Sequence, residues 1–195
     1  MADVGVGMYA KYDGQLVDLR ETFQEHSIDL DQPSTQTNPR ARLIDFSQWV
    51  SCYTFGIRDE VFTMYTHYWD GVAHDVRLKC GEPGGGGWGY RHIEEGHRTH
   101  WQQKLDGARA KGWAAEAYGV HSWDDLMAGA VGSAVTWPEH IGGSFQSATK
   151  CGVTTLYLVD INRPQVVLMS FNVVAVWALN SDRLITAYPA TKTSC

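Results

Sequence analysis

Three histidines occur within nine consecutive residues of this chain, at His92, His97 and His100. Histidine is the side chain whose ordinary pKa, about 6.5, lets it both give and take protons near neutral pH. Two arginines, Arg91 and Arg98, lie beside them in the sequence and could hold an anion. This grouping predicts acid/base chemistry on an anionic substrate. The alternative from the same residues is an ordinary helix with histidines on its solvent-exposed side.

A metal site is the second chemistry that these histidines could support. His97 and His100 are one helical turn apart and could both reach a metal ion, but no third ligand accompanies them at a recognisable spacing. We therefore expect no metal and no cofactor. The chain also has four cysteines that form no C-x-x-C pair: Cys52, Cys80, Cys151 and Cys195. Their spacing does not establish a disulfide, and we expect a reducing compartment.

A helix is predicted over residues 92–111, so it would carry all three histidines. The residues of its apolar face recur at spacings of three and four: Ile93, His97, Trp101, Leu105 and Ala108. At 100° per residue, His92 and His97 would lie about 140° apart on this helix. Both can address one substrate only if His92 lies at or before the start of the helix.

The rest of the second half predicts one more helix and then strands. Ser122 and Asp125 are spaced as in a capping box, which predicts a helix over about 122–134. Three strands are expected after it, over residues 154–161, 165–179 and 183–188, separated by two turns. Helices followed by an antiparallel meander indicate an α+β fold.

The first half of the chain is predicted to be rich in strands. Strands are expected over residues 8–12, 16–19, 46–68 and 76–80. Tight turns are expected at 13–14 and 69–72, and a polar loop with two prolines at 31–39. Residues 81–87 contain five glycines and are interpreted as a flexible connector. We therefore place a domain boundary here, between a β-rich subdomain of residues 1–78 and a second domain of residues 79–195.

Composition restricts the class of protein. With 195 residues, 44% of them hydrophobic, the chain can bury a sizeable core. No apolar run of about 18 residues and no signal peptide is evident, so no membrane anchor is expected. The net charge is -6; residues 1–78 carry six basic and twelve acidic side chains, and residues 79–195 carry ten of each. The absence of a basic footprint argues against a sequence-reading nucleic-acid binder, although a catalytic site that holds one or two phosphates stays compatible with it.

Two segments resemble a known family. Residues 91–97, RHIEEGH, followed about ninety residues later by residues 184–189, LITAYP, are similar to bacterial EndoU-type toxin domains. These belong to the wider barnase, EndoU, colicin and RelE-like nuclease superfamily. The resemblance covers residues 79–195 and leaves residues 1–78 unassigned. It implies N-terminal helices packed on a curved antiparallel sheet, and a metal-independent endoribonuclease.

The resemblance also implies roles for individual residues. His92 and His97 would be the acid/base pair, while Thr186 and Tyr188 would contact the phosphate and orient the substrate. One imidazole would remove the ribose 2′-OH proton, the 2′-oxygen would attack phosphorus, and the other imidazole would protonate the departing 5′-oxygen. The products would carry 2′,3′-cyclic phosphate ends.

The expected substrate-binding residues are Arg91, Arg98, His100 and Arg183. Enzymes of this family usually add a catalytic lysine, which the sequence does not supply at a matching place. Lys150 precedes the predicted sheet and Lys192 follows the second motif, so the arginines are the expected substitutes.

The expected partners follow from the same resemblance. They are an RNA substrate, with tRNA as one candidate, and a cognate immunity protein; the expected location is the cytoplasm of the producing or target cell, with delivery by a secretion system as one route. The competing hypothesis is a non-catalytic protein-binding module whose acidic first part docks a basic partner. An enzyme must bring His92, His97, Thr186 and Tyr188 to one concave surface, whereas a binding module need not.

Overall fold

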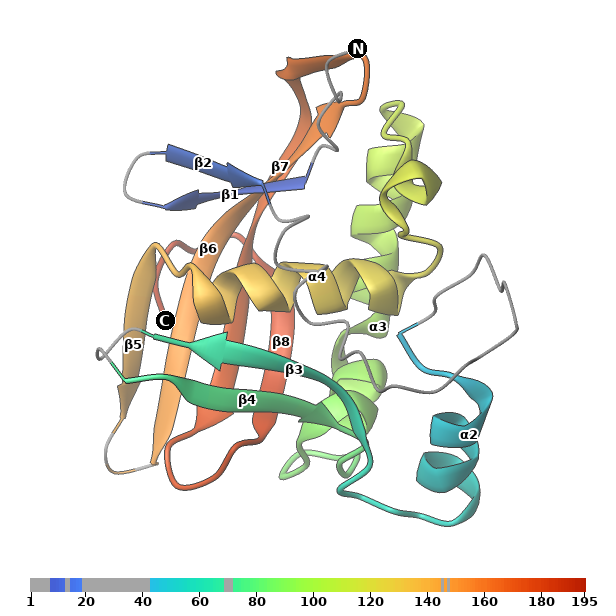
Figure 1. The fold of residues 1–195 in the computed structure, drawn as a ribbon, viewed down its shortest axis with the longest axis vertical. Helices are drawn as coiled ribbons and strands as arrows, with labels where there is room; N and C mark the ends of the chain where they lie inside the picture. Colours follow the sequence, from blue (N-terminus) through green and yellow to red (C-terminus); the bar gives the residue numbers. More distant parts are fainter. Residues whose placement is uncertain (1–7, 13–14, 19–42, 69–71, 145, 147) are drawn as a thin grey trace, which may run out of the picture.

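The computed structural model describes residues 8–12, 15–18, 43–68, 72–144, 146 and 148–195 (Figure 1). The predicted loop at residues 31–39 and the centres of the two predicted turns, 13–14 and 69–71, lie outside the described residues. Helices and antiparallel sheets both occur, so the protein has the α+β fold that the sequence predicts.

A large antiparallel sheet forms the back of the molecule in Figure 1. Its described strands are β1 (Met8–Tyr12), β2 (Gln15–Asp18), β5 (His140–Ser144), β6 (Thr149–Asp160), β7 (Arg163–Ala178) and β8 (Leu184–Ala190). The order is β2-β1-β6-β7-β8, and β5 pairs with β6 beside β1. The predicted meander of β6, β7 and β8 is confirmed, with β6 and β7 longer than the sequence pattern indicated.

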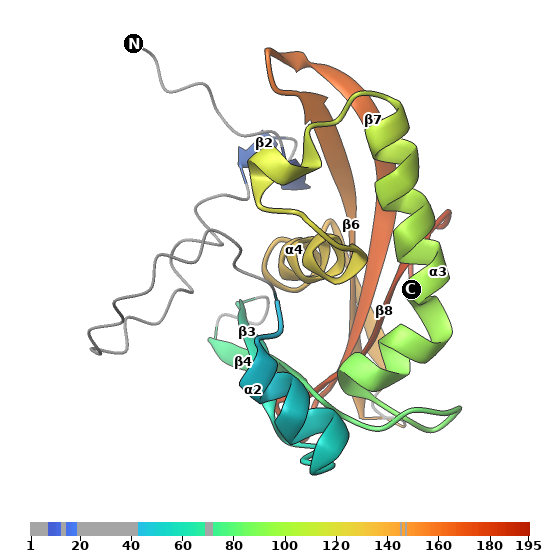
Figure 2. The same cartoon turned by 90° about the vertical axis from the view of Figure 1, so that its right-hand side faces the viewer.

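Two helices pack against this sheet. α4 (Trp123–Thr136) lies between the large sheet and the small one, which explains why almost all of its residues are buried (Figure 2). Its predicted capping box is confirmed, because Asp125 accepts hydrogen bonds from the backbone N–H of Ser122 at 3.0 Å and from its hydroxyl at 2.8 Å. α3 (Gly89–Ala110) runs along the edge strand β8. Among the described residues, no helix is both long and apolar enough to cross a membrane.

A second, two-stranded sheet covers the other side of α4. It consists of β3 (Val61–His67) and β4 (His74–Lys79). The strand predicted over residues 46–68 is therefore correct only in its last part. Residues 46–54 form α2 (Phe46–Trp49) and the π-helix η1 (Val50–Thr54), because Asp45 and Gln48 make a capping box that starts a helix. Here the local cap outweighs the strand preference of the aromatic residues.

The first part of the chain shares its core with the second part. Tyr65 of β3 and Leu78 of β4 belong to the same buried cluster as Trp101 and Leu126, and the Tyr65 hydroxyl donates to the Ala128 carbonyl at 2.9 Å. β4 also runs across the predicted boundary between residues 78 and 79. The described part of residues 1–78 thus completes the core of the whole protein and does not build a separate subdomain.

All four cysteines form disulfides, which the cysteine spacing did not predict. Cys52 bonds to Cys80 and joins η1 to the end of β4; Cys151 bonds to Cys195 and holds the C-terminal tail against β6. Disulfides persist mainly in oxidising compartments, so they count against the reducing compartment expected from the sequence. The bonded cysteines are 28 and 44 positions apart in the sequence, and cross-links of this kind stabilise a fold mainly by restricting the unfolded chain.

Candidate functional site

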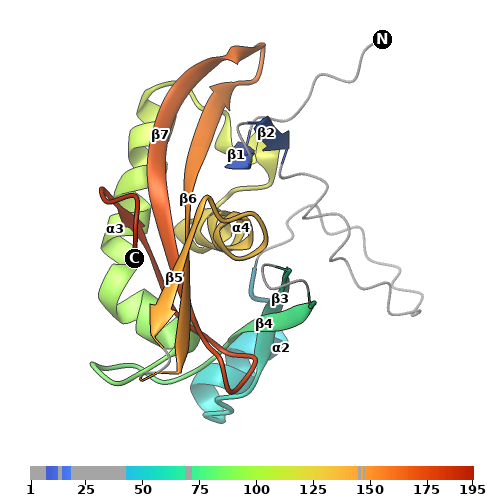
Figure 3. The ribbon, with the colours of Figure 1, turned by 90° about the vertical axis from the view of Figure 1, so that its left-hand side faces the viewer.

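The candidate site lies where α3 meets β8. The Trp101 indole N–H donates to the Ala187 carbonyl at 3.2 Å, and both residues are fully buried. This bond fixes α3 along β8. Figure 3 shows α4 on one face of the strands β6 and β7. Ala187 belongs to the core on that face, and since neighbouring strand residues point to opposite faces, Tyr188 lies on the other face. His97, one turn before Trp101, thereby reaches Tyr188.

Four rings gather at this junction. The His97 ring centroid lies 5.0 Å from that of Tyr188, 6.3 Å from that of His92 and 5.8 Å from that of His100. We call these three histidines and Tyr188 the histidine cluster. Residues about ninety positions apart in the sequence therefore come together, and His97 is at the centre.

His97 has the most unusual environment of the three histidines. Its Nδ1 atom is buried, and no hydrogen-bond partner for it exists among the described residues. Burial lowers the pKa of His97 below its usual value, and the neighbouring His100 and His92 lower it further. Its imidazole is therefore neutral at neutral pH, the form that can accept a proton.

His92 is held by the glycine-rich loop before α3. Its Nδ1 lies 2.9 Å from the Gly84 carbonyl oxygen, and because a carbonyl can only accept, Nδ1 carries the hydrogen. Nε2 is then the nitrogen that can exchange a proton with a ligand. His92 lies inside the first turn of α3 and not before it, yet its ring still comes within 6.3 Å of the His97 ring.

The loop itself is closed, which differs from the flexible connector expected for residues 81–87. Glu82 and Trp88 exchange two backbone hydrogen bonds, of 2.8 and 3.0 Å. Gly81 has φ of 72°, and a Cβ atom there would lie 1.8 Å from the Trp88 carbonyl oxygen. Only glycine fits this position. The loop thus presents the Gly84 carbonyl to His92 at a fixed place.

β8 contributes two polar side chains to the face of the sheet on which Tyr188 meets His97. The Thr186 hydroxyl oxygen is buried, and none of the described residues offers it a hydrogen bond. Thr186 and Tyr188 are two residues apart on one strand and so share a face of the sheet. Tyr188 also packs on the small apolar cluster of Cys151, Val153 and Val174, over which the C-terminal tail is held by the Cys151 disulfide.

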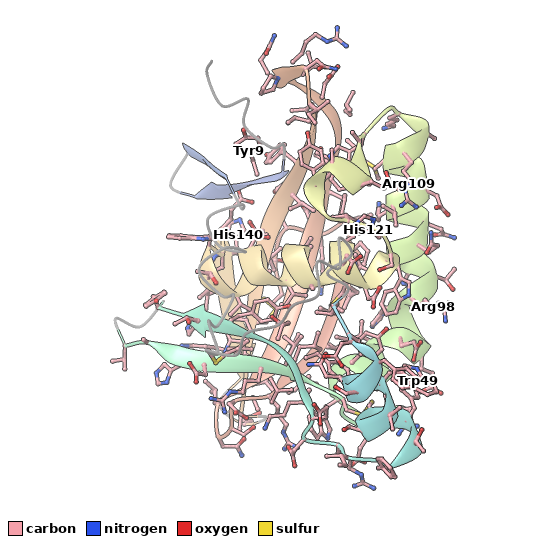
Figure 4. All side chains as sticks on the ribbon, turned by 45° about the vertical axis from the view of Figure 1, so that its right-hand side comes forward. Tyr9, Trp49, Arg98, Arg109, His121 and His140 are labelled. Carbon is pink, nitrogen blue, oxygen red and sulfur yellow. A yellow bond between two sulfur atoms is a disulfide. The ribbon has the colours of Figure 1, made fainter. Side chains whose placement is uncertain are left out.

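Two of the predicted substrate-binding arginines lie on another side of α3. The Arg91 guanidinium is 5.6 Å from the Tyr53 ring centroid, and Arg98 lies 3.5 Å from Glu94. The reason is helical geometry: Arg91 and Arg98 are about 20° apart around the axis, whereas Arg98 and His100 are about 160° apart. Figure 4 shows Arg98 and Trp49 on one side of the molecule.

Arg183 occupies a different place from the other two arginines. Its guanidinium lies 5.0 Å from the ring centroid of Trp88, the residue that caps the N-terminus of α3. It is therefore at the same end of α3 as His92. Gly84, Tyr53 and Trp88, which position His92, Arg91 and Arg183, were not predicted as site residues. The glycine-rich loop of residues 81–87 was the sequence signal that could have indicated Gly84 and the adjacent Trp88.

No family model, curated protein or solved structure matches this chain. The site must therefore be interpreted from its own geometry. Within the described residues, no group of three or more histidine, cysteine, aspartate or glutamate side chains could hold a metal ion. The arrangement offers one neutral imidazole, a second imidazole whose Nδ1 hydrogen is held by the Gly84 carbonyl, a phenol and a buried hydroxyl. Such a set can move protons on a ligand that carries oxygen atoms.

Proposed function

We propose that this protein is a metal-independent endoribonuclease of the toxin type, which cleaves RNA by transesterification. The observation that carries the proposal is the position of His97. Its ring packs between the rings of His92, His100 and Tyr188, and its buried Nδ1 has no partner among the described residues. Two imidazoles at this spacing can each hydrogen-bond one of two oxygens attached to the same phosphorus.

The lowered pKa of His97 supports its role as the general base. It takes the proton of the ribose 2′-OH, and the 2′-oxygen forms a bond to the adjacent phosphorus. The bond between phosphorus and the 5′-oxygen breaks, and His92, protonated at Nε2, gives its proton to that oxygen. The products are a 2′,3′-cyclic phosphate and a free 5′-OH.

Polar groups on β8 and just before it stabilise the transition state in this proposal. Negative charge gathers on the non-bridging phosphate oxygens, and donors aimed at them supply a large part of catalysis. Thr186 and Tyr188 provide hydroxyl donors from one face of β8. Arg183, beside the first turn of α3, is the proposed cation. Arg91 and Arg98 are assigned no catalytic role, since their partners are Tyr53 and Glu94.

The proposed biological setting keeps RNA as the substrate, with tRNA as one candidate, and a cognate immunity protein as the partner. Two disulfides indicate that the protein folds in an oxidising environment. Passage through such an environment on the way to the cytoplasm of a target cell accommodates both the disulfides and an RNA substrate. Delivery by a secretion system is the corresponding route.

The experiment that tests this function is cleavage of bulk cellular RNA in the presence of EDTA. The wild-type protein should cleave RNA and spare DNA, because DNA lacks the 2′-OH. The matched control is His140→Ala, which removes an exposed histidine from β5 and should leave the rate unchanged. RNA that stays intact between about pH 5 and pH 8 would refute the proposal.

A second candidate function, a protein-binding module, is favoured by one surface. Large apolar side chains are exposed on α2 and on the segment that follows η1: Phe46 (80%), Trp49, Phe55 (71%) and Ile57. A concentration of this kind is typical of contact surfaces. On this reading the partner presents apolar residues to this surface and basic residues to the acidic first part of the chain. The double variant Phe46→Ser, Phe55→Ser should then lose binding of the partner, while the histidine cluster stays intact.

A further inference from the structure

The C-terminal tail, residues 191–195, lies across one face of the large sheet. Its beginning is held by Asn172 of β7, whose side-chain N–H groups donate to the carbonyl oxygens of Thr191 and Lys192 at 3.3 and 3.0 Å. Figure 3 shows the C-terminus on the side of β6 and β7 that is turned away from α4. The tail therefore lies on the face of the sheet that carries Tyr188.

The end of the tail is held by the disulfide between Cys195 and Cys151 of β6, which we call the tail disulfide. The strand β5 leaves room for this bond. Its residue Gly142 pairs with Cys151, and a Cβ atom at Gly142 would lie 3.0 Å from the Cβ atom of Cys195. A larger residue at Gly142 would thus press against the end of the tail.

Between these two contacts, the tail crosses a pair of apolar residues. Val153 of β6 and Val174 of β7 are cross-strand partners, and they lie two residues from Cys151 and from Asn172 respectively. Their side chains are buried, with 2% and 0% of the residue exposed. Tyr188 is the partner of Val174 on the next strand. The tail therefore covers the apolar cluster on which Tyr188 packs.

The two disulfides of the protein differ in their access to a reducing agent. Cys52 and Cys80 are both 0% exposed and belong to the main core. In the tail disulfide, Cys151 is buried but Cys195 is exposed. A thiolate must reach one of the two sulfur atoms to break a disulfide, and exposed disulfides are the more easily reduced ones. Reduction should therefore break the tail disulfide first.

The fold does not depend on the tail disulfide. β8 stays paired with β7 through its backbone ladder, and α3 stays fixed to β8 through the hydrogen bond from Trp101 to Ala187. The tail begins after β8. Without the disulfide, the hydrogen bonds from Asn172 hold only its first two residues, and water can replace them on exposed carbonyl groups. Reduction should release the tail and leave the sheet intact.

We propose that the tail is a redox latch, which the tail disulfide closes and a small thiol such as glutathione opens. One thiolate attacks the sulfur of Cys195, the bond to Cys151 breaks, and the Cys151 sulfur leaves as a thiolate that takes up a proton. A second thiolate then attacks the mixed disulfide on Cys195. In total, two small thiols are oxidised to one disulfide, and both protein sulfurs become thiols.

The latch controls the histidine cluster, and this part of the proposal rests on the proposed function. Thr186, Val176 and Cys151 are successive partners across β8, β7 and β6, so the tail disulfide lies in the same cross-strand row as Thr186. The Thr186 hydroxyl oxygen is buried in the closed form, so a phosphate reaches it only after a neighbouring segment has moved. The latch thus keeps the site closed in an oxidising environment and opens it in a reducing one.

Thiol mapping on the full, oxidised chain tests the order of reduction. Reduced glutathione is added in graded amounts, free thiols are blocked with iodoacetamide, and the modified cysteines are identified by mass spectrometry. Cys151 and Cys195 should be modified at a glutathione concentration at least about tenfold lower than Cys52 and Cys80. Equal reduction of both disulfides, or earlier reduction of the Cys52–Cys80 bond, would overturn the proposal.

Methyl NMR with a soluble gadolinium chelate tests whether the tail leaves. The chelate should broaden the methyl signals of Val153 and Val174 after reduction of the tail disulfide but not before, and should spare Leu126 of the main core in both states. Cys195→Ala should show the broadening without glutathione, and the matched control Ser194→Ala should not. Valine signals that stay protected after reduction, or loss of the folded spectrum, would contradict the latch.

Control of the ribonuclease is a separate measurement. RNA cleavage by wild-type protein should rise several-fold when only the tail disulfide is reduced, and Cys195→Ala should cleave at the raised rate without glutathione. Equal rates in the closed and open forms would overturn control of the site by the latch. Absence of cleavage in both forms would instead refute the ribonuclease function, while thiol mapping and methyl exposure would still decide whether the latch exists.

Discussion

His67 and His97 both pack an imidazole ring against an aromatic side chain, yet their nitrogen atoms are in opposite situations. The His67 ring lies 5.1 Å from that of Trp177, and both of its nitrogens have partners, Val135 and Lys150. The His97 ring lies 5.0 Å from that of Tyr188, but its buried Nδ1 has no partner among the described residues. The two ring distances are nearly equal, but the hydrogen bonding of the imidazole nitrogens differs.

The difference indicates what each histidine is for. A buried polar group that is satisfied contributes to the fold, whereas one left unsatisfied costs free energy that must be balanced elsewhere. Such costs are common at functional sites. We therefore expect His67 to be required for stability and His97 for chemistry, and the predictions below test that division.

The largest effect is expected from His97→Ala. Removing one acid/base group should lower the rate of RNA cleavage by on the order of 10² to 10⁴. The midpoint of thermal unfolding should change little, because His97 is only partly buried and its Nδ1 loses no hydrogen bond. His92→Ala should lower the rate over the same range. A variant that folds and retains its rate would remove His97 from the mechanism.

The next effect concerns His67. His67→Ala removes a buried ring and a hydrogen bond to the Val135 carbonyl, so the free energy of unfolding should fall by about 2 to 4 kcal/mol. Cleavage per folded molecule should stay as in wild type. Denaturant unfolding combined with a rate measurement at low temperature separates the two. A loss of rate without a loss of stability would reverse the assigned roles.

A smaller effect is expected from Tyr188→Phe. The ring keeps its packing against His97 and the apolar cluster, and only the hydroxyl is lost. The rate should fall by about tenfold or less, because one neutral hydrogen bond is worth about 0.5 to 1.5 kcal/mol. Arg98→Gln, on the other side of α3, is the matched control and should leave the rate unchanged. Equal losses in both variants would point to general disturbance of α3.

The smallest effect is a dependence of stability on pH. The folded pKa of His97 is below the ordinary value of about 6.5, so the unfolded chain takes up this proton first as the pH falls. The protein should therefore lose stability as the pH drops below about 6.5, until the folded pKa is passed. His97→Gln should lack this part of the loss. Parallel unfolding curves for both proteins across this range would contradict the shift.

Local signals predicted the parts of the fold that depend on near neighbours. Ser122 and Asp125 are three residues apart, and the capping box that they form starts α4 as expected. The helix at 46–54 was missed because aromatic residues suggested a strand, although Asp45 and Gln48 have the spacing of a capping box. The Cys52–Cys80 bond, in contrast, is not evident from a local pattern. The common core was missed because no local pattern reveals it. β3 packs on α4, and β4 packs on β8, only in the folded chain.

The candidate site was predictable in its residue types but not in its geometry. The bond from Trp101 to Ala187 joins residues 86 positions apart and sets His97 against Tyr188. No local pattern contains that contact. The placement of Arg91 and Arg98, in contrast, could have been predicted from the helical repeat, because they lie on the side of α3 away from His100.

Analysis of the product ends tests the central claim most directly. The substrate is a DNA oligonucleotide with one ribonucleotide, incubated with wild-type protein and EDTA. We predict one cut, 3′ to the ribonucleotide, which leaves a 2′,3′-cyclic phosphate and a free 5′-OH. The same oligonucleotide with a 2′-O-methyl group should stay intact, as should the ribonucleotide substrate with His97→Ala. Cleavage of the 2′-O-methyl substrate, or 5′-phosphate ends on the products, would show that the 2′-oxygen is not the nucleophile and that the histidine cluster does not act as we propose.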